Sequence, residues 1–305
     1  MEKPTVRIVI LNYNGSEMTL NLVRQLKHQT FQNFETIVVD NASRESEQNI
    51  LKQNLPENTV LIESKKNLGY SAGNNLGMRH KSEQNIDYHL ILNNDILIED
   101  TNYIQKMIDG MLLYKDKNVV ASSSLIYLQN SVPKEKEFHH VRKILSFGKM
   151  YCLMSPFLNL FIKLFARKIT NEYFYKSQMP YTNQYMICDT INGAGFIIDA
   201  AFMKENGYLD EGTFLYCEEI ILGRQIKNKN KHCLLNGFTS VEHFQGVSTK
   251  SNPTSLSPKM ERYKYKSALY YFKKYDNLGF LGSQVFILSG EISILLKKIK
   301  EIFRK

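Results

Sequence analysis

The sequence predicts an α/β protein with a mostly parallel central sheet flanked by helices. Four short apolar runs rich in valine and isoleucine lie in the first third of the chain, at Val6–Leu11, Glu35–Asp40, Val60–Glu63 and His89–Leu92. Stretches long enough for a helix separate these runs. Strands that are apolar on both faces and alternate with helices are typical of a parallel sheet covered on both sides.

The connecting segments have the periodicity of helices. Apolar residues recur at three- and four-residue spacing over 18–26, over the shorter stretch 50–55, and most clearly over 104–112. Strand character resumes at Val119–Tyr127. The first half of the fold is therefore expected to extend over 1–127.

The remaining chain divides into three parts. From 128 to 187 the hydrophobic pattern weakens, which indicates an insertion. Order returns at Cys188–Asp199, Gly207–Gln225 and Lys231–His243. We therefore expect one domain over 1–248, whose second half is 188–248, followed by a helical, basic extension over 249–305.

Composition and charge narrow the class of protein. The 305 residues are 43% hydrophobic and 23% charged, which excludes a disordered chain. The net charge of +9 favours an anionic partner such as a phosphorylated substrate, a membrane face or nucleic acid. The four cysteines have no Cys-x-x-Cys spacing, so neither a zinc site nor a disulfide framework is expected.

Two features concern the location of the protein. No apolar run reaches the ~18–20 residues of a membrane-spanning helix, and the N-terminus lacks the pattern of a signal peptide, so a cytoplasmic protein is expected. The last helix has one apolar stripe, formed by Val285, Leu288, Ile292, Leu295, Leu296, Ile299, Ile302 and Phe303, with basic residues on or near its other face. Such a helix either lies on an anionic bilayer or packs its stripe on the core, and the sequence leaves both open.

Polar residues follow three of the predicted strands. The first runs into Asn12-Tyr13-Asn14-Gly15, the second into Asp40-Asn41-Ala42-Ser43, and the fourth into Asn93-Asn94-Asp95. Each alone would suit a turn or a helix cap. Because the carboxyl ends of parallel strands meet at one edge of a sheet, the three together indicate a ligand site.

A segment rich in small residues, Asn67–Gly77, follows the third strand. Glycine and alanine at this density let a backbone approach a ligand closely, and amide groups entering a helix suit phosphate. The segment matches neither the Gly-x-x-x-x-Gly-Lys phosphate loop nor Gly-x-Gly-x-x-Gly. This argues against a P-loop nucleotidase and, less strongly, against a dinucleotide dehydrogenase.

Taken in order, these segments resemble the family-2 glycosyltransferases of the GT-A fold, and within them the rhamnosyltransferase-like and galactofuranosyltransferase-like branch. Four later segments follow the same branch, at Ile191–Phe196, Gly207–Glu211, Tyr216–Glu219 and Val241–His243. The resemblance covers about 5–127 and 188–248. It implies that the first half binds a nucleotide sugar and that the second half carries the acceptor and catalytic residues.

The resemblance implies a donor pocket at the strand ends. Asp40 would accept hydrogen bonds from the base or ribose of a nucleoside diphosphate sugar, and Asn12 and Asn14 would line the same pocket. Asn74 and its loop would meet the donor. The donor-binding set implied in this way is Asn12, Tyr13, Asn14, Asp40, Asn41, Ser43, Asn67, Gly69, Asn74, Asn93, Asn94, Asn192 and Gly193.

The resemblance also implies a metal site for Mg²⁺ or Mn²⁺. Asp95 stands where the family's Asp-x-Asp motif has its last carboxylate, and His243 would be the second protein ligand. A divalent ion neutralises the charge that develops on a leaving diphosphate. With one carboxylate instead of two, the expected site is weak and filled mainly when donor phosphates complete it. An Asp/His pair suits Mn²⁺.

Glu218 and Glu219 stand where the family usually has Glu-Asp or Asp-Asp. An inverting transfer needs a base for the acceptor hydroxyl, and a positioned carboxylate serves. Glu219 is expected to be this base, with Glu218 holding the acceptor or tuning its neighbour. Two adjacent carboxylates can raise the pKa of one of them. The alternative is a solvated acidic start of a helix.

The predicted function is that of an inverting glycosyltransferase. In bacteria, members of this branch build capsule, O-antigen or cell-wall polysaccharides, so the expected acceptor is a glycan or lipid-linked glycan. Peripheral contact with the inner face of the membrane would suit the basic last helix. The alternatives are a sugar nucleotidyltransferase and a catalytically inactive protein that binds nucleotide sugars. A nucleic-acid partner is not expected, because no zinc-finger or RNP-type motif is present.

Overall fold

The computed structural model describes residues 3–128, 141–154, 163–244 and 257–302. The first half contains β1 (Val6–Asn12), α1 (Ser16–Leu26), β2 (Phe34–Asp40), α2 (Glu45–Asn54), β3 (Thr59–Glu63), α3 (Tyr70–Met78), β4 (Tyr88–Asn93), β5 (Ile96–Leu97), α4 (Tyr103–Leu113), η1 (Lys115–Lys117) and β6 (Val119–Leu128). The rest contains α5 (Phe147–Met154), α7 (Lys163–Tyr173), η3 (Lys176–Gln178), β7 (Tyr185–Cys188), β8 (Gly195–Asp199), α8 (Ala200–Glu205), α9 (Glu218–Asn228), β9 (His232–His243), α10 (Pro258–Tyr275) and α11 (Phe280–Ile302).

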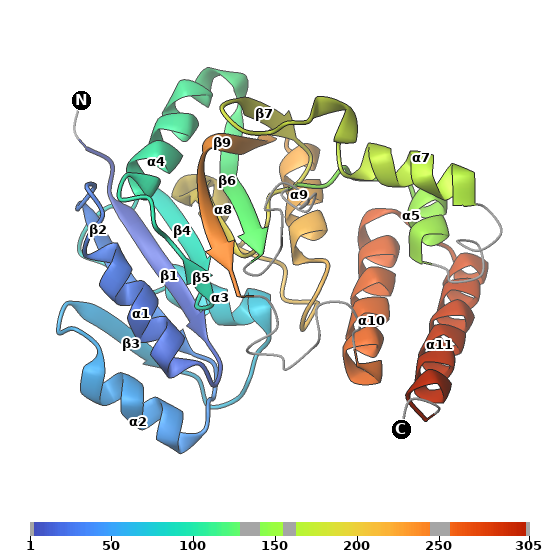
Figure 1. Ribbon diagram of the computed structural model, residues 1–305, viewed down its shortest axis with the longest axis horizontal. Helices are drawn as coiled ribbons and strands as arrows, with labels where there is room; N and C mark the ends of the chain where they lie inside the picture. The colour runs from blue at the N-terminus through green and yellow to red at the C-terminus, as the bar shows by residue number, and fades with distance from the viewer. Residues whose placement is uncertain (1–2, 129–140, 155–162, 245–256, 303–305) are drawn as a thin grey trace.

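The predicted α/β class is confirmed, and the first four long strands form its parallel part. They lie in the order β3-β2-β1-β4, and all three pairings are parallel (Figure 1). The register places Asn12 opposite Asp40, and Leu11 opposite Asn93. The carboxyl ends of β1, β2 and β4 therefore meet at one edge of the sheet, as the sequence predicted.

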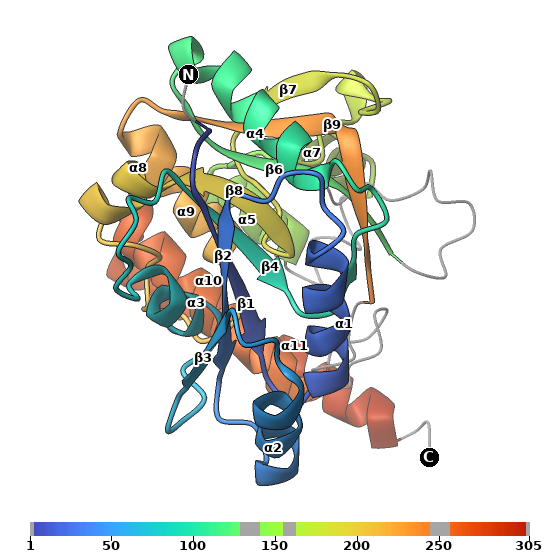
Figure 2. The ribbon, with the colours of Figure 1, turned by 90° about the vertical axis from the view of Figure 1, so that its left-hand side faces the viewer.

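Helices cover both faces of this sheet. Leu22 of α1, Leu51 of α2 and Met107 of α4 belong to one buried apolar cluster, and Met78 of α3 and Met203 of α8 belong to another. Figure 2 shows α1 and α3 on opposite sides of the sheet. The strands read as continuous apolar runs because both of their faces are buried in this way.

The second half of the sheet is mixed, which the sequence did not predict. β8 runs antiparallel to β4 and to β6, while β6 and β9 are parallel. β5 and β7 each pair antiparallel with β9. A short apolar run buried on both faces has the same pattern in either direction, so the sequence of β8 does not reveal which way it runs.

The segment predicted as an insertion contributes to both the sheet and the helical end of the molecule. Its last element, β7, pairs with β9. Its helix α5 packs beside α10 and α11, where Phe147 contacts Phe272 and Phe286 at ring-centroid distances of 4.9 and 6.2 Å. The expected helical C-terminal extension is present as the α10–α11 pair, and its predicted first residue, 249, lies outside the described residues.

Helix α11 packs with a face that contains Phe286, Ile294 and several small residues, and it leaves the apolar stripe predicted from the sequence mostly exposed. Ser289, Gly290 and Ser293 are buried, and a Cβ at Gly290 would lie 2.8 Å from the Tyr265 ring. The stripe residue Leu288 is 63% exposed, and most of the described stripe shares this exposure. The predicted stripe therefore does not pack on the core within the described part of α11, although Ile302 and Phe303 have no described side-chain placement.

The same helix is long and apolar enough to cross a membrane, by length and composition. The stretch Phe280–Ile299 has a mean hydropathy of 1.4 and is one-third buried. This differs from the expectation of no such segment, because an average over the helix tolerates Glu291, which interrupts an apolar run.

Candidate active site

A buried hydrogen-bond network joins the ends of β1, β2 and β4. The Asn12 amide donates to Asp40 Oδ1 at 2.8 Å. Asn12 Oδ1 accepts from Thr19 Oγ1 at 2.9 Å and from the Asn94 amide at 3.1 Å. All four residues are buried. Because buried polar groups require partners, this network fixes the three strand ends relative to one another and brings together three of the predicted donor residues.

The carboxylate of Asp40 is fully enclosed by donors. Besides the Asn12 amide, its Oδ2 accepts from the Ser43 backbone N–H and from Gln48 Nε2, both at 3.0 Å. Ser43 Oγ in turn accepts from the Asn14 backbone N–H at 2.8 Å. These hydrogen bonds compensate the cost of burying the carboxylate. Tyr13, by contrast, is 38% exposed at the edge of this cluster.

The glycine-rich loop is fixed to both halves of the molecule. The Asn41 amide donates to Asn67 Oδ1 at 3.1 Å and to the Gly69 carbonyl at 3.0 Å. Gly69 has a φ of +82°, and a Cβ there would lie 2.2 Å from the Phe214 carbonyl oxygen. Only glycine suits this left-handed, crowded position. Asn74 is buried in α3, and among the described residues its Oδ1 has no hydrogen-bond partner.

Asp95 and His243, which are 148 residues apart in sequence, are in contact. His243 Nε2 lies 3.1 Å from Asp95 Oδ1. The pairing of β5 with β9 causes this, because it places Ile96 opposite His243 and the Phe244 N–H donates to the Asp95 carbonyl at 2.8 Å. A carboxylate oxygen and an imidazole nitrogen are suitable ligands for Mn²⁺.

These two side chains fit a metal site that needs further ligands. Among the described residues, no group of three or more histidine, cysteine, aspartate or glutamate side chains could hold a metal ion. Asp95 and His243 can therefore supply one oxygen and one nitrogen, and the remaining positions would go to water or phosphate oxygens.

The two adjacent glutamates begin α9. Glu219 Oε1 lies 3.3 Å from Nη1 of Arg142, and a Cβ at Gly193 would lie 3.4 Å from the same Glu219 oxygen. Burial, and next the charge of Glu219, raise the pKa of Glu218 to about 8. Among the described residues, Glu218 Oε2 has no hydrogen-bond partner. At neutral pH the Glu218 carboxyl is therefore mainly protonated.

The turn at Asn192–Ala194 connects these groups. Its Ala194 carbonyl accepts from the Asn93 N–H at 2.8 Å, which ties the turn to the end of β4. The Gly193 carbonyl accepts from the Tyr70 hydroxyl at 2.5 Å, which ties it to α3. Asn192 Oδ1 accepts from the Ala194 N–H at 2.9 Å and so shapes the turn itself. The glutamates and the Asp95–His243 pair thus belong to segments that meet at one turn.

Some residues of the site were not found from the sequence. Arg142 lies in the segment predicted as an insertion, whose pattern gives no signal for it. Asn75 bonds to the backbone of Leu209 at 2.8 and 3.0 Å and so joins the two halves, although it lies inside the glycine-rich segment. The guanidinium of Arg224, five residues after Glu219, pairs with Asp276 at 2.5 Å.

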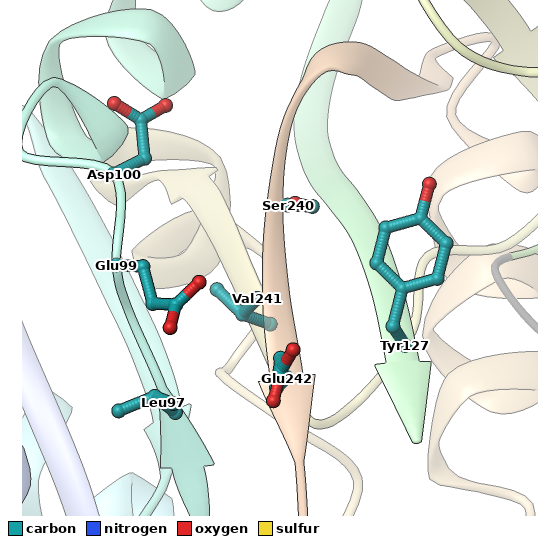
Figure 3. A pocket seen from close by; sticks show the side chains of 7 residues that line it. All are labelled: Leu97, Glu99, Asp100, Tyr127, Ser240, Val241 and Glu242. Atoms are coloured by element: carbon teal, nitrogen blue, oxygen red, sulfur yellow. The ribbon is translucent and has the colours of Figure 1, made fainter. Parts of the chain in front are cut away.

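A cavity of about 360 Å³ lies along β5 and β9, and its lining residues Leu97 and Glu242 are near Asp95 and His243 in sequence (Figure 3). Leu97 and Glu242 face each other across the strand pairing, and Tyr127 lies on the other side of β9. The carboxylates of Glu99, Asp100 and Glu242 line this space. The acidic side chains that line the cavity would repel a diphosphate, so we do not assign the cavity to the donor.

The fold and these residues define a glycosyltransferase of the GT-A fold. Residues 7–174, more than half of the chain, match the model of the family described as glycosyl transferase family 2. The chain therefore belongs to glycosyl transferase family 2. The match runs through most of the predicted insertion and stops before 188–248, so the segments predicted to carry the catalytic residues lie outside it. No curated protein matches the sequence significantly.

Two solved structures show the same fold at low sequence identity. One is a mannosyltransferase from Pyrobaculum calidifontis, PcManGT, in complex with GDP-Man and Mn²⁺ (11% identity, TM-score 0.57, 95% of this chain and 69% of that chain). The other is GalNAc-T7 with UDP, GalNAc and Mn²⁺ (14% identity, TM-score 0.58, 90% of this chain and 49% of that chain). The present chain thus spans about half the length of GalNAc-T7.

Proposed function

We propose that this glycosyltransferase inverts the anomeric centre as it moves a sugar from a nucleoside diphosphate sugar to a hydroxyl of a growing bacterial cell-surface glycan. The sugar would be rhamnose, galactofuranose or a hexose. The observation that supports this most directly is the position of Glu219 against Gly193, in the turn whose Ala194 contacts the end of β4. The base and the predicted metal ligands then lie on segments joined by one short turn.

The reaction is a single displacement. The Glu219 carboxylate accepts the proton of the acceptor hydroxyl as the hydroxyl oxygen bonds to the anomeric carbon. The bond from that carbon to the diphosphate oxygen breaks, and its electron pair leaves with the nucleoside diphosphate. Glu218, which is protonated at neutral pH, can donate a hydrogen bond to the acceptor but cannot take its proton.

Asp95 and His243 are the residues that would hold a divalent ion. When bound, Mg²⁺ or Mn²⁺ supplies neutralising charge to the leaving diphosphate. Both neighbouring structures with this fold contain Mn²⁺, which supports the same choice here.

A screen of donors by thermal shift tests the donor and the metal together. Ligands that bind the native state raise its melting temperature by mass action. UDP-, GDP- and dTDP-sugars are compared with and without Mn²⁺, and the donor should give the largest shift, enhanced by the metal. Asp95→Asn should remove the enhancement, whereas Asp116→Asn, an exposed change in η1, should keep it. An identical shift with and without Mn²⁺ for every donor would contradict the metal assignment.

Replacing the proposed base tests the mechanism. With the donor found in that screen, Glu219→Gln should lower the transfer rate by roughly 10²–10⁴-fold and leave the donor-induced thermal shift unchanged. Glu211→Gln is the matched control, because Glu211 pairs with Arg79 on the surface. Full activity in Glu219→Gln would remove Glu219 as the base. A wild-type protein without transfer from any donor would favour the inactive nucleotide-sugar-binding protein instead.

The acceptor is proposed to be lipid-linked, with the enzyme in the cytoplasm and α11 resting on the inner face of an anionic membrane. Phe280 and Leu281 are more than three-quarters exposed at the start of the helix, and near its end the exposed Leu295 and Leu296 lie close in sequence to the exposed Lys298. Lys297, by contrast, pairs with the buried Glu261. Exposed apolar residues beside lysines suit an anionic bilayer surface.

Flotation with liposomes tests this contact. The wild-type chain should float with vesicles containing phosphatidylglycerol and less with neutral phosphatidylcholine vesicles. Leu281→Glu with Leu288→Glu should abolish flotation, while Leu113→Glu, at a leucine of α4 that is 65% exposed, should not. Equal flotation of all three chains would reject a membrane role for α11.

A further inference from the structure

Arg142 is fixed beside the catalytic glutamates by its own backbone. Its N–H donates to Thr190 Oγ1 at 2.9 Å, and the Thr190 hydroxyl donates back to the Arg142 carbonyl at 2.9 Å. Two residues on, the Ile144 N–H donates to Asp189 Oδ2 at 2.9 Å. Asp189 and Thr190 come just before the Asn192–Ala194 turn. Their hydrogen bonds therefore fix the position of Arg142 relative to that turn.

The guanidinium of Arg142 is placed to distinguish two neighbouring carboxylates. It lies 3.3 Å from Glu219, with Arg142 29% and Glu219 18% exposed at their side chains. A partly desolvated ion pair interacts more strongly than a surface pair. Of the two glutamates, Glu219 is the one that lies at ion-pair distance from this cation, and the nearby Glu218 has one carboxyl oxygen without a hydrogen-bond partner among the described residues. The charge of Arg142 also lowers the pKa of Glu218, but burial outweighs it and keeps that pKa raised.

The other titratable groups that face Glu219 are neutral at physiological pH. Burial raises the pKa of Tyr70, of Tyr173 and of the Cys217 thiol. Glu218 keeps its proton up to a pKa of about 8. The charge that faces Glu219 from this described set is therefore that of Arg142.

We propose that Arg142 is a positioning residue, which keeps Glu219 ionised and correctly oriented while the proton of the glutamate pair stays on Glu218. This inference rests on the proposed role of Glu219 as the base. It assigns a function in catalysis to the segment that precedes α5, which lies outside the sequence resemblance. Without the cation, the two carboxylates would share the proton, and the fraction of chains with an ionised Glu219 would fall at neutral pH.

A titration that needs no substrate tests the charge effect. The protein is labelled with carbon-13 at the glutamate side-chain carboxyls, and the two resonances are assigned with Glu218→Gln and Glu219→Gln. In wild type, the Glu219 resonance should titrate at lower pH than that of Glu218. In Arg142→Gln its midpoint should rise by at least one pH unit, and in Arg142→Lys by less. Lys143→Gln is the matched control, because Lys143 faces Glu172 at 3.6 Å.

Kinetics with the donor from the thermal-shift screen provide the second readout. Loss of the cation raises the pH needed to ionise the base, so the acidic limb of the kcat/KM profile should move up by about one unit in Arg142→Gln. Activity should then fall about tenfold on the acidic side and recover at high pH, with KM for the donor unchanged. A uniform loss at all pH values, or an increase in donor KM alone, would assign Arg142 a structural or donor-binding role and overturn the proposal.

The two hypotheses fail in distinguishable ways. If Glu219→Gln keeps full activity, the assignment of the base fails, whatever Arg142 does. If Glu219→Gln is inactive but Arg142→Gln leaves both the Glu219 titration and the pH profile unchanged, only the role of Arg142 fails. Thermal melting of each variant shows that it is folded before either measurement is interpreted.

Discussion

The proposed nucleotide end and the proposed catalytic end of the site satisfy their buried charges differently. The carboxylate of Asp40 accepts three hydrogen bonds from neutral donors, and the surrounding amides are paired with one another. At the start of α9, two carboxylates share one arginine, and Glu218 Oε2 has no partner among the described residues. The first arrangement gives a rigid surface of paired polar groups, whereas the second contains a carboxyl whose pKa, raised to about 8 by burial, lies close to neutral pH. A binding surface requires the first property, and a site for proton transfer requires the second.

The largest expected effect is at the nucleotide end. Asp40→Ala leaves the donors of Asn12, Ser43 and Gln48 without their acceptor, so it should destabilise the protein by about 3–5 kcal/mol. Urea unfolding measures this loss, and Asp116→Ala, at an exposed aspartate of η1, should leave the midpoint unchanged. If Asp40→Ala lost no more stability than the control, the hydrogen-bond network around Asp40 would not be needed for folding. The proposed contrast between the two ends of the site would then fail.

A smaller effect is expected where the glycine-rich loop meets the second half. Gly69→Ala should cost roughly 2–4 kcal/mol, because the new methyl group meets the Phe214 carbonyl at a left-handed φ. Gly207→Ala separates the two causes. Gly207 has a φ of +78° and open space around it, so this variant should lose only about 1 kcal/mol. Equal losses in thermal denaturation would mean that the close approach to Phe214 has no energetic role.

The smallest effect should appear at the catalytic end and depend on pH. Burial raises the pKa of Glu218 to about 8, so between the ordinary glutamate pKa and pH 8 the folded state binds more protons than the unfolded state. Stability should therefore fall as pH rises through this window. Glu218→Gln removes this pH-dependent loss of stability. The variant should be more stable than the wild type by on the order of 1–3 kcal/mol at pH 8.5 and equally stable at pH 4. Urea unfolding of both chains at the two pH values gives the comparison, and a gain that is independent of pH would contradict it.

Local patterns predicted the elements better than their pairing. The apolar runs of β1, β2, β3 and β4 were found because each is buried on both faces, and the helical period located α1 and α4. β5 has only two residues, which is too short for any periodicity, and the direction of β8 depends on partners distant in sequence. The apolar stripe of α11 was found from its helical periodicity. Periodicity alone does not show whether such a stripe packs on the core or stays exposed.

The site residues divide in the same way. Polar residues at the strand ends indicated a ligand site from their positions alone, because parallel topology brings those ends together. The closeness of Asp95 to His243 was implied by the family resemblance and arises from the pairing of β5 with β9. The role of Arg142 could not be predicted from the sequence. A single ion pair between residues 77 positions apart produces no periodicity, motif or compositional bias.

The place of β9 in the sheet has a consequence for biosynthesis. It is the last strand of the described chain, yet it forms the pairings described for β5 and β7 and extends along β6. A nascent chain that ends before residue 232 has no partner for β5 or β7, and one that ends before residue 243 has no histidine to contact Asp95. Late insertion of such a strand requires contacts far apart in sequence, which form slowly. The contact between Asp95 and His243 can therefore form only after nearly all of the domain predicted over 1–248 has been translated.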